Sequence, residues 1–587
     1  MTQYLNGLRV ILSCALIALF STVFQNCGEQ EGADLILTNG RVYTLSWDDP
    51  ATDGIPAPNA PYAADGWQPD AEALAIRDGR IIFAGSHEEV SQFYQERKTR
   101  SIDVEGATII PGLVDSHTHV VGLGRALTEL NLVGVETEEE AVVRAVKWAK
   151  KIPKGEWIVG GGWDEGAWAN RYPDMKLLSA RIPDHPVCLR GLHGFAIWGN
   201  RKAFEIAGIT AETEAPIGGE IRKDANGNPT GILINNATDL LESAVPSPTH
   251  DQRIEHLLAG LNAMAEDGYV AVHEAGVTSE FMEALETLEA ERKLPIRFYA
   301  MLNSRDEQLL RRWLERGPKT DPEGMLVVRS VKAHYDGALG SRGARLLDDY
   351  SDTPGHRGVS GGDYGFNQDI VAEMMKAGFQ VGIHAIGDAG NRETLDFIES
   401  VLKEFPAARD GRHRIEHAQV IHPDDLDRFA KLNVIASMEP PHAVEDKPWA
   451  EARIGAERIK GAYAWRSLRQ SGARLTFNSD LSGSDHSIFY GLHAAITRRD
   501  KNRQPPEGWY PEQNMTPEEA IRAYTSWSAF SAFLENETGV IEPGRWADIT
   551  VMDIDPFVLG ETDPGKILEG KIIMTIVNGE IIYRREL

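Results

Sequence analysis

The chain has 587 residues, which at roughly 150 residues per domain suggests about four domains, although one α/β barrel absorbs about 250 residues or more. Its hydrophobic fraction of 42%, charged fraction of 25% and aromatic fraction of 8% are typical of globular proteins and exclude a disordered or fibrous chain. The formal net charge of −28 opposes a phosphate-neutralising surface, so it argues against DNA or RNA as a partner.

An apolar segment lies near the N-terminus. Residues 10–24 follow Arg9 as a nearly unbroken apolar run of about 15 residues, which is short for a membrane span and typical of a secretion signal. We therefore predict a signal peptide over residues 1–26 and an exported protein of the cell envelope, either periplasmic or anchored to the membrane.

The end of this segment suggests a membrane anchor. It closes with Val-Phe-Gln-Asn-Cys, and the last residue, Cys27, stands where bacterial lipoproteins carry their lipidated cysteine. Lipidation of Cys27 would attach the protein to the membrane through its acyl chains. Ordinary cleavage nearby and an uncleaved anchor are the alternatives, because Phe24 and Asn26 are bulkier or more polar than the usual residues.

Short strands separated by turn residues occupy both ends of the remaining chain. Asn-Gly at 39–40, Asp-Gly at 78–79 and Asn-Gly at 578–579 each lie between two short apolar runs, which predicts hairpins. Because each end alone offers few strands and exposed edges, we predict that residues 33–112 and 535–587 combine in one composite β-sandwich. Two independent β-modules are the alternative.

In the middle of the chain, apolar β-rich runs alternate with helical stretches, as a parallel sheet requires. Eight such runs occur, the number of strands that closes a TIM barrel, and we place the barrel at 113–534. The gap between the first two runs is too long for one crossover helix and predicts an insertion at about 125–265. The runs cover residues 108–117, 269–274, 296–302, 329–335, 379–384, 413–417, 434–438 and 474–480.

Several of these runs end in residues that bind metals. On an extended strand, His117 and His119 point to the same side, so both imidazoles can reach one cation. This pair alone is a weak signal, but later runs end in or near His384, His417 and Asp480. Polar groups buried at several strand ends cost stability unless they satisfy one another or a ligand, so we predict one shared site.

The motifs around these residues resemble those of amidohydrolase family 3, the group that contains N-substituted formamide deformylase-like enzymes. The resemblance extends from residue 33 to the C-terminus. It implies an α/β fold, a distorted (β/α)8 TIM barrel flanked by a composite β-sandwich built from both chain ends. The markers are Asp-Gly-Arg-Ile at 78–81, Pro-Gly-Leu-Val-Asp-Ser-His-Thr-His at 111–119, Val-Lys-Ala-His-Tyr-Asp-Gly-Ala-Leu-Gly-Ser-Arg at 331–342, His-Ala-Ile-Gly-Asp at 384–388, Arg-Ile-Glu-His-Ala at 414–418, the strand ending at Asp480, and 539–548.

The same resemblance implies roles for six side chains. His117 and His119 would hold one divalent metal, and His384 and His417 would hold a second, with zinc expected in both. Lys332 would bridge the two metals as a carboxylated lysine, since an amine near cations favours its neutral, nucleophilic form. Asp480 would be the general base that serves a metal-activated hydroxide. A helix cap is the alternative for Asp480, and an ordinary ion-paired lysine is the alternative for Lys332.

Candidate substrate contacts come from the insertion and from other strand ends. Trp163 and His193 lie in segments that resemble those lining the substrate pocket of this family, whereas Arg342 and His442 lie at or just beyond strand ends. The alternative for Trp163 is packing of the insertion.

The expected function is hydrolysis of a C–N bond, in an amide, formamide or cyclic amide of a small molecule. Deamination, ester hydrolysis or isomerisation at the same site is the alternative chemistry, because the fold alone does not decide the reaction. A lipoprotein that binds a ligand without catalysis is the alternative class, although such a protein would have no need of Asp480. The sequence says nothing of the oligomeric state.

Overall fold

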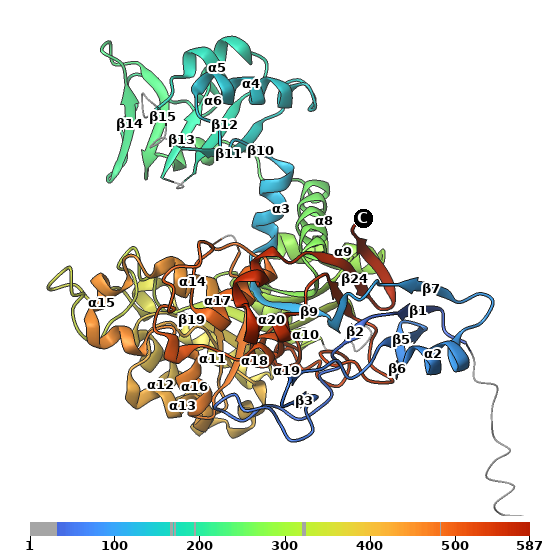
Figure 1. Ribbon diagram of the computed structural model, residues 1–587. Coiled ribbons are helices and arrows are strands. Elements are labelled where there is room, and N and C mark those ends of the chain that lie inside the picture. Colours follow the sequence, from blue (N-terminus) through green and yellow to red (C-terminus); the bar gives the residue numbers. More distant parts are fainter. Residues whose placement is uncertain are drawn as a thin grey trace, which may run out of the picture.

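The computed structural model describes residues 32–164, 168, 172–192, 195–319, 324–481 and 483–586. The predicted signal peptide, Cys27 and His193 lie outside these residues. Across the described part of the chain, every helix is too short or too polar to cross a membrane. Figure 1 shows a barrel, a β-rich region that contains both ends of the described chain, and a separate lobe carried on two helices.

Eight parallel strands form a nearly closed barrel, which confirms the predicted barrel, and each predicted run contains one of the barrel strands. The first and last strands approach each other at their C-terminal ends, where the amide of Asp480, which follows β22, donates to the carbonyl of His117 in β9 at 3.0 Å. In sheet order the strands are β22 (Arg474–Phe477), β21 (Ile435–Met438), β20 (Arg414–His417), β19 (Gln380–Ala385), β18 (Leu326–His334), β17 (Arg297–Asn303), β16 (Tyr269–Val277) and β9 (Leu113–Thr118).

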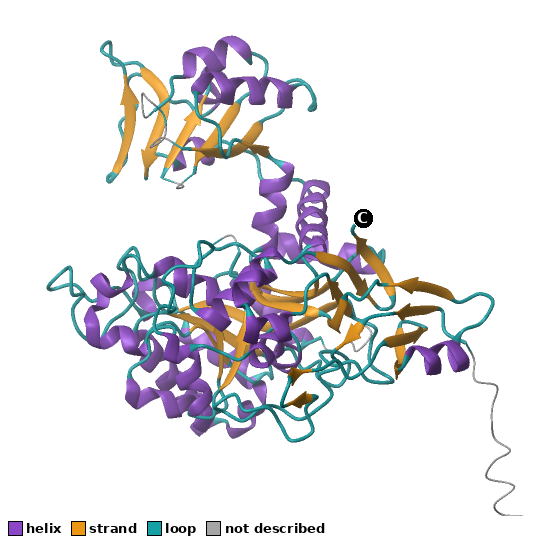
Figure 2. Cartoon of the chain, viewed as in Figure 1, coloured by secondary structure: helices purple, strands orange, loops and turns teal. Residues whose placement is uncertain are grey.

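Helices surround the barrel strands, as Figure 2 shows. In α10 (Glu307–Arg316), Asp306 caps the first turn by accepting from the Leu309 amide at 2.9 Å, and Leu309, Leu310 and Trp313 face the core. The other helices are α9 (Ser279–Ala290), α11 (Gln368–Lys376), α12 (Asp388–Glu404), α13 (Leu426–Leu432), α14 (Pro440–Asp446), α15 (Ala450–Arg458), α16 (Trp465–Gln470), α17 (Ile488–Thr497), α18 (Pro517–Ala523), α19 (Ser526–Ser531) and α20 (Pro556–Thr562), with 3-10 turns at Gly361–Tyr364, Pro406–Gly411, Pro423–Asp425, Ile459–Gly461, Pro511–Gln513 and Pro564–Glu569.

The run predicted as the first barrel strand, 108–117, is two strands that belong to different sheets. β8 (Thr108–Pro111) pairs with a C-terminal strand, and only β9 enters the barrel. The chain changes sheets at Gly112, whose amide donates to the Asp548 carbonyl at 2.9 Å. A Cβ atom at Gly112 would lie 2.4 Å from the Val270 side chain, so glycine permits this close approach.

Two further sheets contain strands from the chain ends. A four-stranded sheet contains only N-terminal strands, in the order β6 (Arg80–Gly85), β5 (Ala73–Arg77), β1 (Leu35–Thr38) and β7 (Arg100–Asp103). A five-stranded sheet mixes both ends, in the order β2 (Arg41–Val42), β8, β23 (Ile549–Met552), β24 (Ile572–Val577) and β25 (Glu580–Arg584). Side chains from both sheets, among them Leu37, Ile76, Val551 and Ile576, share one hydrophobic cluster.

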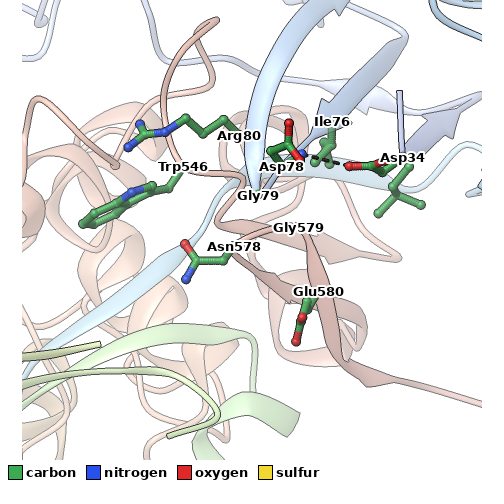
Figure 3. Close-up of a pocket in the computed structure, with 10 residues that line it drawn as sticks. Asp34, Ile76, Asp78, Gly79, Arg80, Trp546, Asn578, Gly579 and Glu580 are labelled. Carbon is green, nitrogen blue, oxygen red and sulfur yellow. Dashed lines mark hydrogen bonds between the residues drawn. The ribbon is translucent and has the colours of Figure 1, made fainter. Parts of the chain in front are cut away.

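Two of the three predicted hairpin turns close hairpins. The turns at 78–79 and 578–579 close the hairpins β5–β6 and β24–β25, and they meet beside a surface cavity of about 600 Å³ (Figure 3). The turn at 39–40 closes no hairpin, because β1 and β2 pair with strands of different sheets. Helix α2 (His87–Tyr94) lies between β6 and β7 in the sequence. The short strands β3 (Tyr62–Ala63) and β4 (Gly66–Trp67) pair with each other.

The segment expected as an insertion forms the separate lobe, whose six-stranded sheet stands above the barrel in Figure 1. Helix α3 (Val120–Thr128) leads from the barrel into the lobe, and α8 (His250–Glu266) leads back. The lobe contains β10 (Leu130–Asn131), β11 (Ile158–Trp163), β12 (Val187–Gly191), β13 (Ala196–Gly199), β15 (Pro229–Asn235), β14 (Gly219–Lys223), α4 (Glu138–Ala149), α5 (Met175–Arg181), α6 (Arg201–Ile206) and α7 (Asp239–Glu242).

The two connecting helices pack against each other through glycines. A Cβ atom at Gly124 of α3 would lie 1.7 Å from the His256 carbonyl oxygen, whereas one at Gly122 would meet nothing within 4 Å. We expect Gly124→Ala to push α3 and α8 apart and to lower the free energy of unfolding by about 1–3 kcal/mol. Gly122→Ala, the matched control, should leave stability unchanged or raise it by about 1 kcal/mol. Denaturant unfolding measures both, and equal effects would contradict the packing argument.

Candidate metal centre

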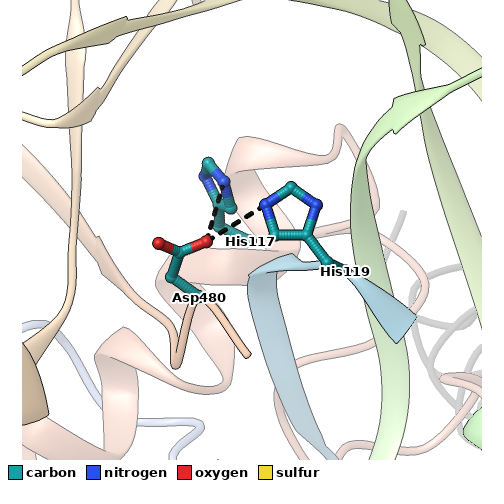
Figure 4. A group of neighbouring side chains, drawn as sticks. All are labelled: His117, His119 and Asp480. Atoms are coloured by element: carbon teal, nitrogen blue, oxygen red, sulfur yellow. Dashed lines mark ion pairs between the residues drawn. The ribbon is translucent and has the colours of Figure 1, made fainter. Parts of the chain in front are cut away.

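The C-terminal ends of the barrel strands bring the predicted ligands together. His117 and His119 come from the end of β9, and Asp480 follows β22. Asp480 Oδ1 lies 3.2 Å from His119 Nε2 and 3.5 Å from His117 Nε2, as Figure 4 shows. Two imidazoles and a carboxylate at this spacing are suitable ligands for a divalent cation.

A second group shares Asp480. The ligand atoms of His417, His442 and Asp480 all lie within 4.8 Å of one another, and His442 Nε2 is 3.9 Å from Asp480 Oδ2. The ring of His384, at the end of β19, lies 4.4 Å from the ring of His417. His384 Nε2 is buried and has no hydrogen-bond partner among the described residues. An unsatisfied buried nitrogen beside other donors fits a metal site.

Lys332, in β18, lies against His117. Its Nζ atom is 3.1 Å from His117 Nε2, and its side chain is almost completely buried. Burial lowers the pKa of Lys332, although Glu416 and Asp480 favour the charged form. A larger fraction of neutral amine favours reaction with carbon dioxide, so the environment is compatible with the predicted carboxylation.

The site also shifts the pKa of its other members. Burial, followed by the charge of Lys332, holds the pKa of His117 well below its usual value, so the ring is neutral and able to bind a metal. Burial raises the pKa of Asp480, but the hydrogen bond with His119 and the electrostatic effect of the neighbouring imidazoles outweigh burial and hold the pKa well below its usual value. Asp480 is therefore ionised.

Backbone strain accompanies these side chains. Asp480 has a φ of 47° and His417 a φ of 74°, a region that residues other than glycine adopt at a cost of about 1–3 kcal/mol. Hydrogen bonds hold Asp480 there, because its amide donates to the His117 carbonyl and its carbonyl accepts from the Gly483 amide at 2.7 Å. The strained backbone directs the carboxylate toward the histidines.

The residues predicted to contact the substrate lie in different parts of the structure. His442 lies in the site, whereas Arg342 points elsewhere and forms a bidentate ion pair with Asp352 at 2.8 and 3.1 Å. Trp163 is completely buried in the lobe, where its Nε1 donates to the Leu189 carbonyl at 2.9 Å. The complete burial of Trp163 agrees with the packing alternative, whereas a substrate contact of Arg342 stays a prediction.

We expect Trp163→Ala to lower the free energy of unfolding by about 3–5 kcal/mol, because it removes a large side chain from the core of the lobe. Phe195→Ala is the control in the same lobe, since the Phe195 side chain is 64% exposed and should contribute about 0.5 kcal/mol or less. Thermal unfolding compares the two variants. If Trp163→Ala were as stable as the parent protein but bound substrate less tightly, the packing role would be wrong.

Three buried carboxylates near the histidines were not assigned roles from the sequence, namely Asp336, Glu416 and Glu439. Glu416 directly precedes His417 in β20, and an acidic residue beside a predicted ligand in a barrel strand was the available signal. The contact of Glu416 with His117 depends on barrel closure, which brings β20 close to β9, whereas Glu439 and His417 lie at the ends of the neighbouring strands β21 and β20.

Comparisons with known proteins agree with this geometry. The model of the amidohydrolase family matches residues 100–583. The amidohydrolase YtcJ of Bacillus subtilis is 32% identical over 88% of this chain and 96% of its own length, and N-substituted formamide deformylase of Arthrobacter pascens is 27% identical over 88% and 95%. A metal-dependent hydrolase of Pyrococcus furiosus, 26% identical, superimposes with a TM-score of 0.71 over 89% of this chain and 99% of its own. The chain therefore belongs to the amidohydrolase family.

Proposed function

We propose that the protein hydrolyses a C–N bond in a small molecule, namely an amide, a formamide or a cyclic amide. The observation that carries this proposal is the convergence of His117, His119, His417 and Asp480 at one end of the barrel, with Lys332 buried among them. The similarity to N-substituted formamide deformylase supports the choice of bond.

The proposed cofactor is a pair of divalent cations, with zinc favoured by the nitrogen-rich donor set. His117 and His119 would hold one cation, His384 and His417 the other, and Lys332 would join them once carboxylated. A bound divalent cation lowers the pKa of a water molecule and polarises a carbonyl group.

Asp480 is the proposed general base. Its ionised carboxylate lies beside the histidines, where it would take a proton from the attacking water and deliver it to the leaving nitrogen. His119 Nε2, 3.2 Å from Asp480 Oδ1, would place the carboxylate beside the cation that His119 holds. His442, on the other side of Asp480, would face the substrate.

We also propose export to the cell envelope, with attachment through a lipidated Cys27. The apolar run 10–24 supports this proposal. Mass spectrometry of the mature N-terminus tests it: an acylated Cys27 is the expected result, and an unmodified N-terminus at another residue would contradict lipidation.

Metal analysis combined with a substrate screen tests the proposed function. We expect about two divalent ions per chain, and loss of hydrolysis on chelation with recovery when zinc is returned. The screen should contain N-substituted formamides, linear amides and lactams, with matched esters and amino-heterocycles. A protein that binds no metal, or that turns over only the esters or the amino-heterocycles, would contradict the proposal.

A further inference from the structure

Two buried carboxylates contact the ring nitrogens of predicted metal ligands. Glu416 Oε2 lies 2.6 Å from His117 Nδ1, and Glu439 Oε2 lies 3.1 Å from His417 Nδ1. At most 5% of any of these four side chains is exposed. Asp336 lies farther from its histidine, with Oδ1 3.8 Å from His384 Nε2, too far for a hydrogen bond.

Arg414 holds Glu416 in place from the interior of the barrel. Its Nη2 donates to Glu416 Oε2 at 2.8 Å, and its Nε lies 2.8 Å from Glu416 Oε1. The same Nη2 also lies 2.6 Å from the Ser116 carbonyl and 2.9 Å from Ser437 Oγ. Arg414 and Glu416 are both completely buried, and their ion pair accompanies the contact of Glu416 Oε2 with His117.

The opposite nitrogen of His117 faces the proposed metal centre. His117 Nε2 is 3.1 Å from Lys332 Nζ and 3.5 Å from Asp480 Oδ1, while Nδ1 faces Glu416. A neutral imidazole carries one proton, and a carboxylate at 2.6 Å places that proton on the nitrogen it faces. The other nitrogen then has a free lone pair for a cation.

We propose that Glu416 and Glu439 are positioning residues that hold His117 and His417 as Nδ1–H tautomers with Nε2 directed at the metal centre. This inference rests on the proposed function, because it assigns the two glutamates a role in binding its cations. Arg414 takes part by fixing Glu416. In the absence of either glutamate, the ring would populate both tautomers and additional orientations, and metal affinity would fall.

Glu416→Gln tests the assignment with a nearly isosteric change. Glu416 Oε2 accepts from both His117 and Arg414, and Arg414 Nε faces the other oxygen. A glutamine amide has one oxygen and would place an NH2 group against one of these donors. We expect Zn²⁺ affinity, measured by competition with a chromophoric chelator, to fall about 10–100-fold.

Glu518→Gln is the matched control for removing a buried charge. Glu518 is also completely buried and accepts from an arginine, Arg522, at 2.9 Å, but it contacts Trp47 instead of a histidine. We expect the control to lower the thermal midpoint as Glu416→Gln does, while its Zn²⁺ affinity stays within about twofold of the parent value. An equal loss of affinity in the control would assign Glu416 a purely structural role.

A double-mutant cycle shows whether Glu416 acts through His117. In a His117→Ala background, Glu416→Gln should cause no further loss of affinity for the remaining Zn²⁺, whereas independent effects would add. If Glu416→Gln fails to fold, Glu439→Gln with His417→Ala provides the same cycle at the second pair. If the glutamate variants bound Zn²⁺ as tightly as the parent protein, the positioning role would be wrong but the proposed function would stand. If the parent protein itself bound no Zn²⁺, the proposed function would be wrong.

Discussion

Replacing Asp480 with asparagine is expected to lower kcat by about 10²–10⁴-fold while the metal content stays the same. Asparagine has nearly the same shape and keeps an oxygen near His117 and His119, so the donor atoms of the site remain. It cannot take a proton from water, because its amide is not basic. Metal analysis and steady-state kinetics on the same preparation measure both properties.

Asp485→Asn is the control for this variant. Asp485 lies five residues farther along the chain and forms an ion pair with Lys501, outside the group of histidines. We expect it to retain parent activity. Full activity of Asp480→Asn would show that another residue moves the proton, and loss of the metal together with activity would make Asp480 chiefly a ligand.

Replacing Lys332 with alanine is expected to reduce both metal content and activity, with kcat/KM falling about 10³-fold, equivalent to about 4 kcal/mol of transition-state stabilisation. In the proposed site a carboxylated Lys332 is the only ligand shared by both cations. Its loss leaves a buried space beside His117 that a small carboxylate can enter. Acetate or propionate should therefore restore part of the activity of the alanine variant.

Mass spectrometry of the intact parent protein should also show the added mass of one carbon dioxide. Lys447→Ala is the control, because Lys447 is a partly buried lysine paired with Asp500 outside the site. It should keep its metal and show no response to acetate. If Lys332→Ala kept its metals, or if neither the adduct nor the rescue were found, Lys332 would be an ordinary buried lysine.

Local sequence patterns were sufficient to predict the barrel strands. Most of them are rich in apolar residues, and burial on both faces removes the alternation expected of a sheet with one exposed face. The sequence pattern could not reveal the break at Gly112, because β8 and β9 form one continuous buried run and the sheet that each joins is decided by distant strands. The turn at 39–40 failed as a hairpin for the same reason, since pairing is a long-range property.

The candidate metal ligands could be predicted from motifs. The neighbours of the predicted substrate contacts could not. Arg342 lies in a motif that resembles those of the family, yet its partner is Asp352, which is provided by the fold of the following loop. Trp163 ends a strand in the sequence, but the hydrophobic core of the lobe encloses it. A residue type and its spacing do not specify which neighbours fold around it.

The sequence by itself determined the α/β class, the residues with metal-binding chemistry and the family to which they point, because strand periodicity and ligand motifs are local. Only the tertiary structure decided that Asp480 lies within hydrogen-bonding reach of His119, that Lys332 lies against His117, and that Glu416 stands behind the same ring. These contacts join residues separated by more than 200 positions, and barrel closure brings them together.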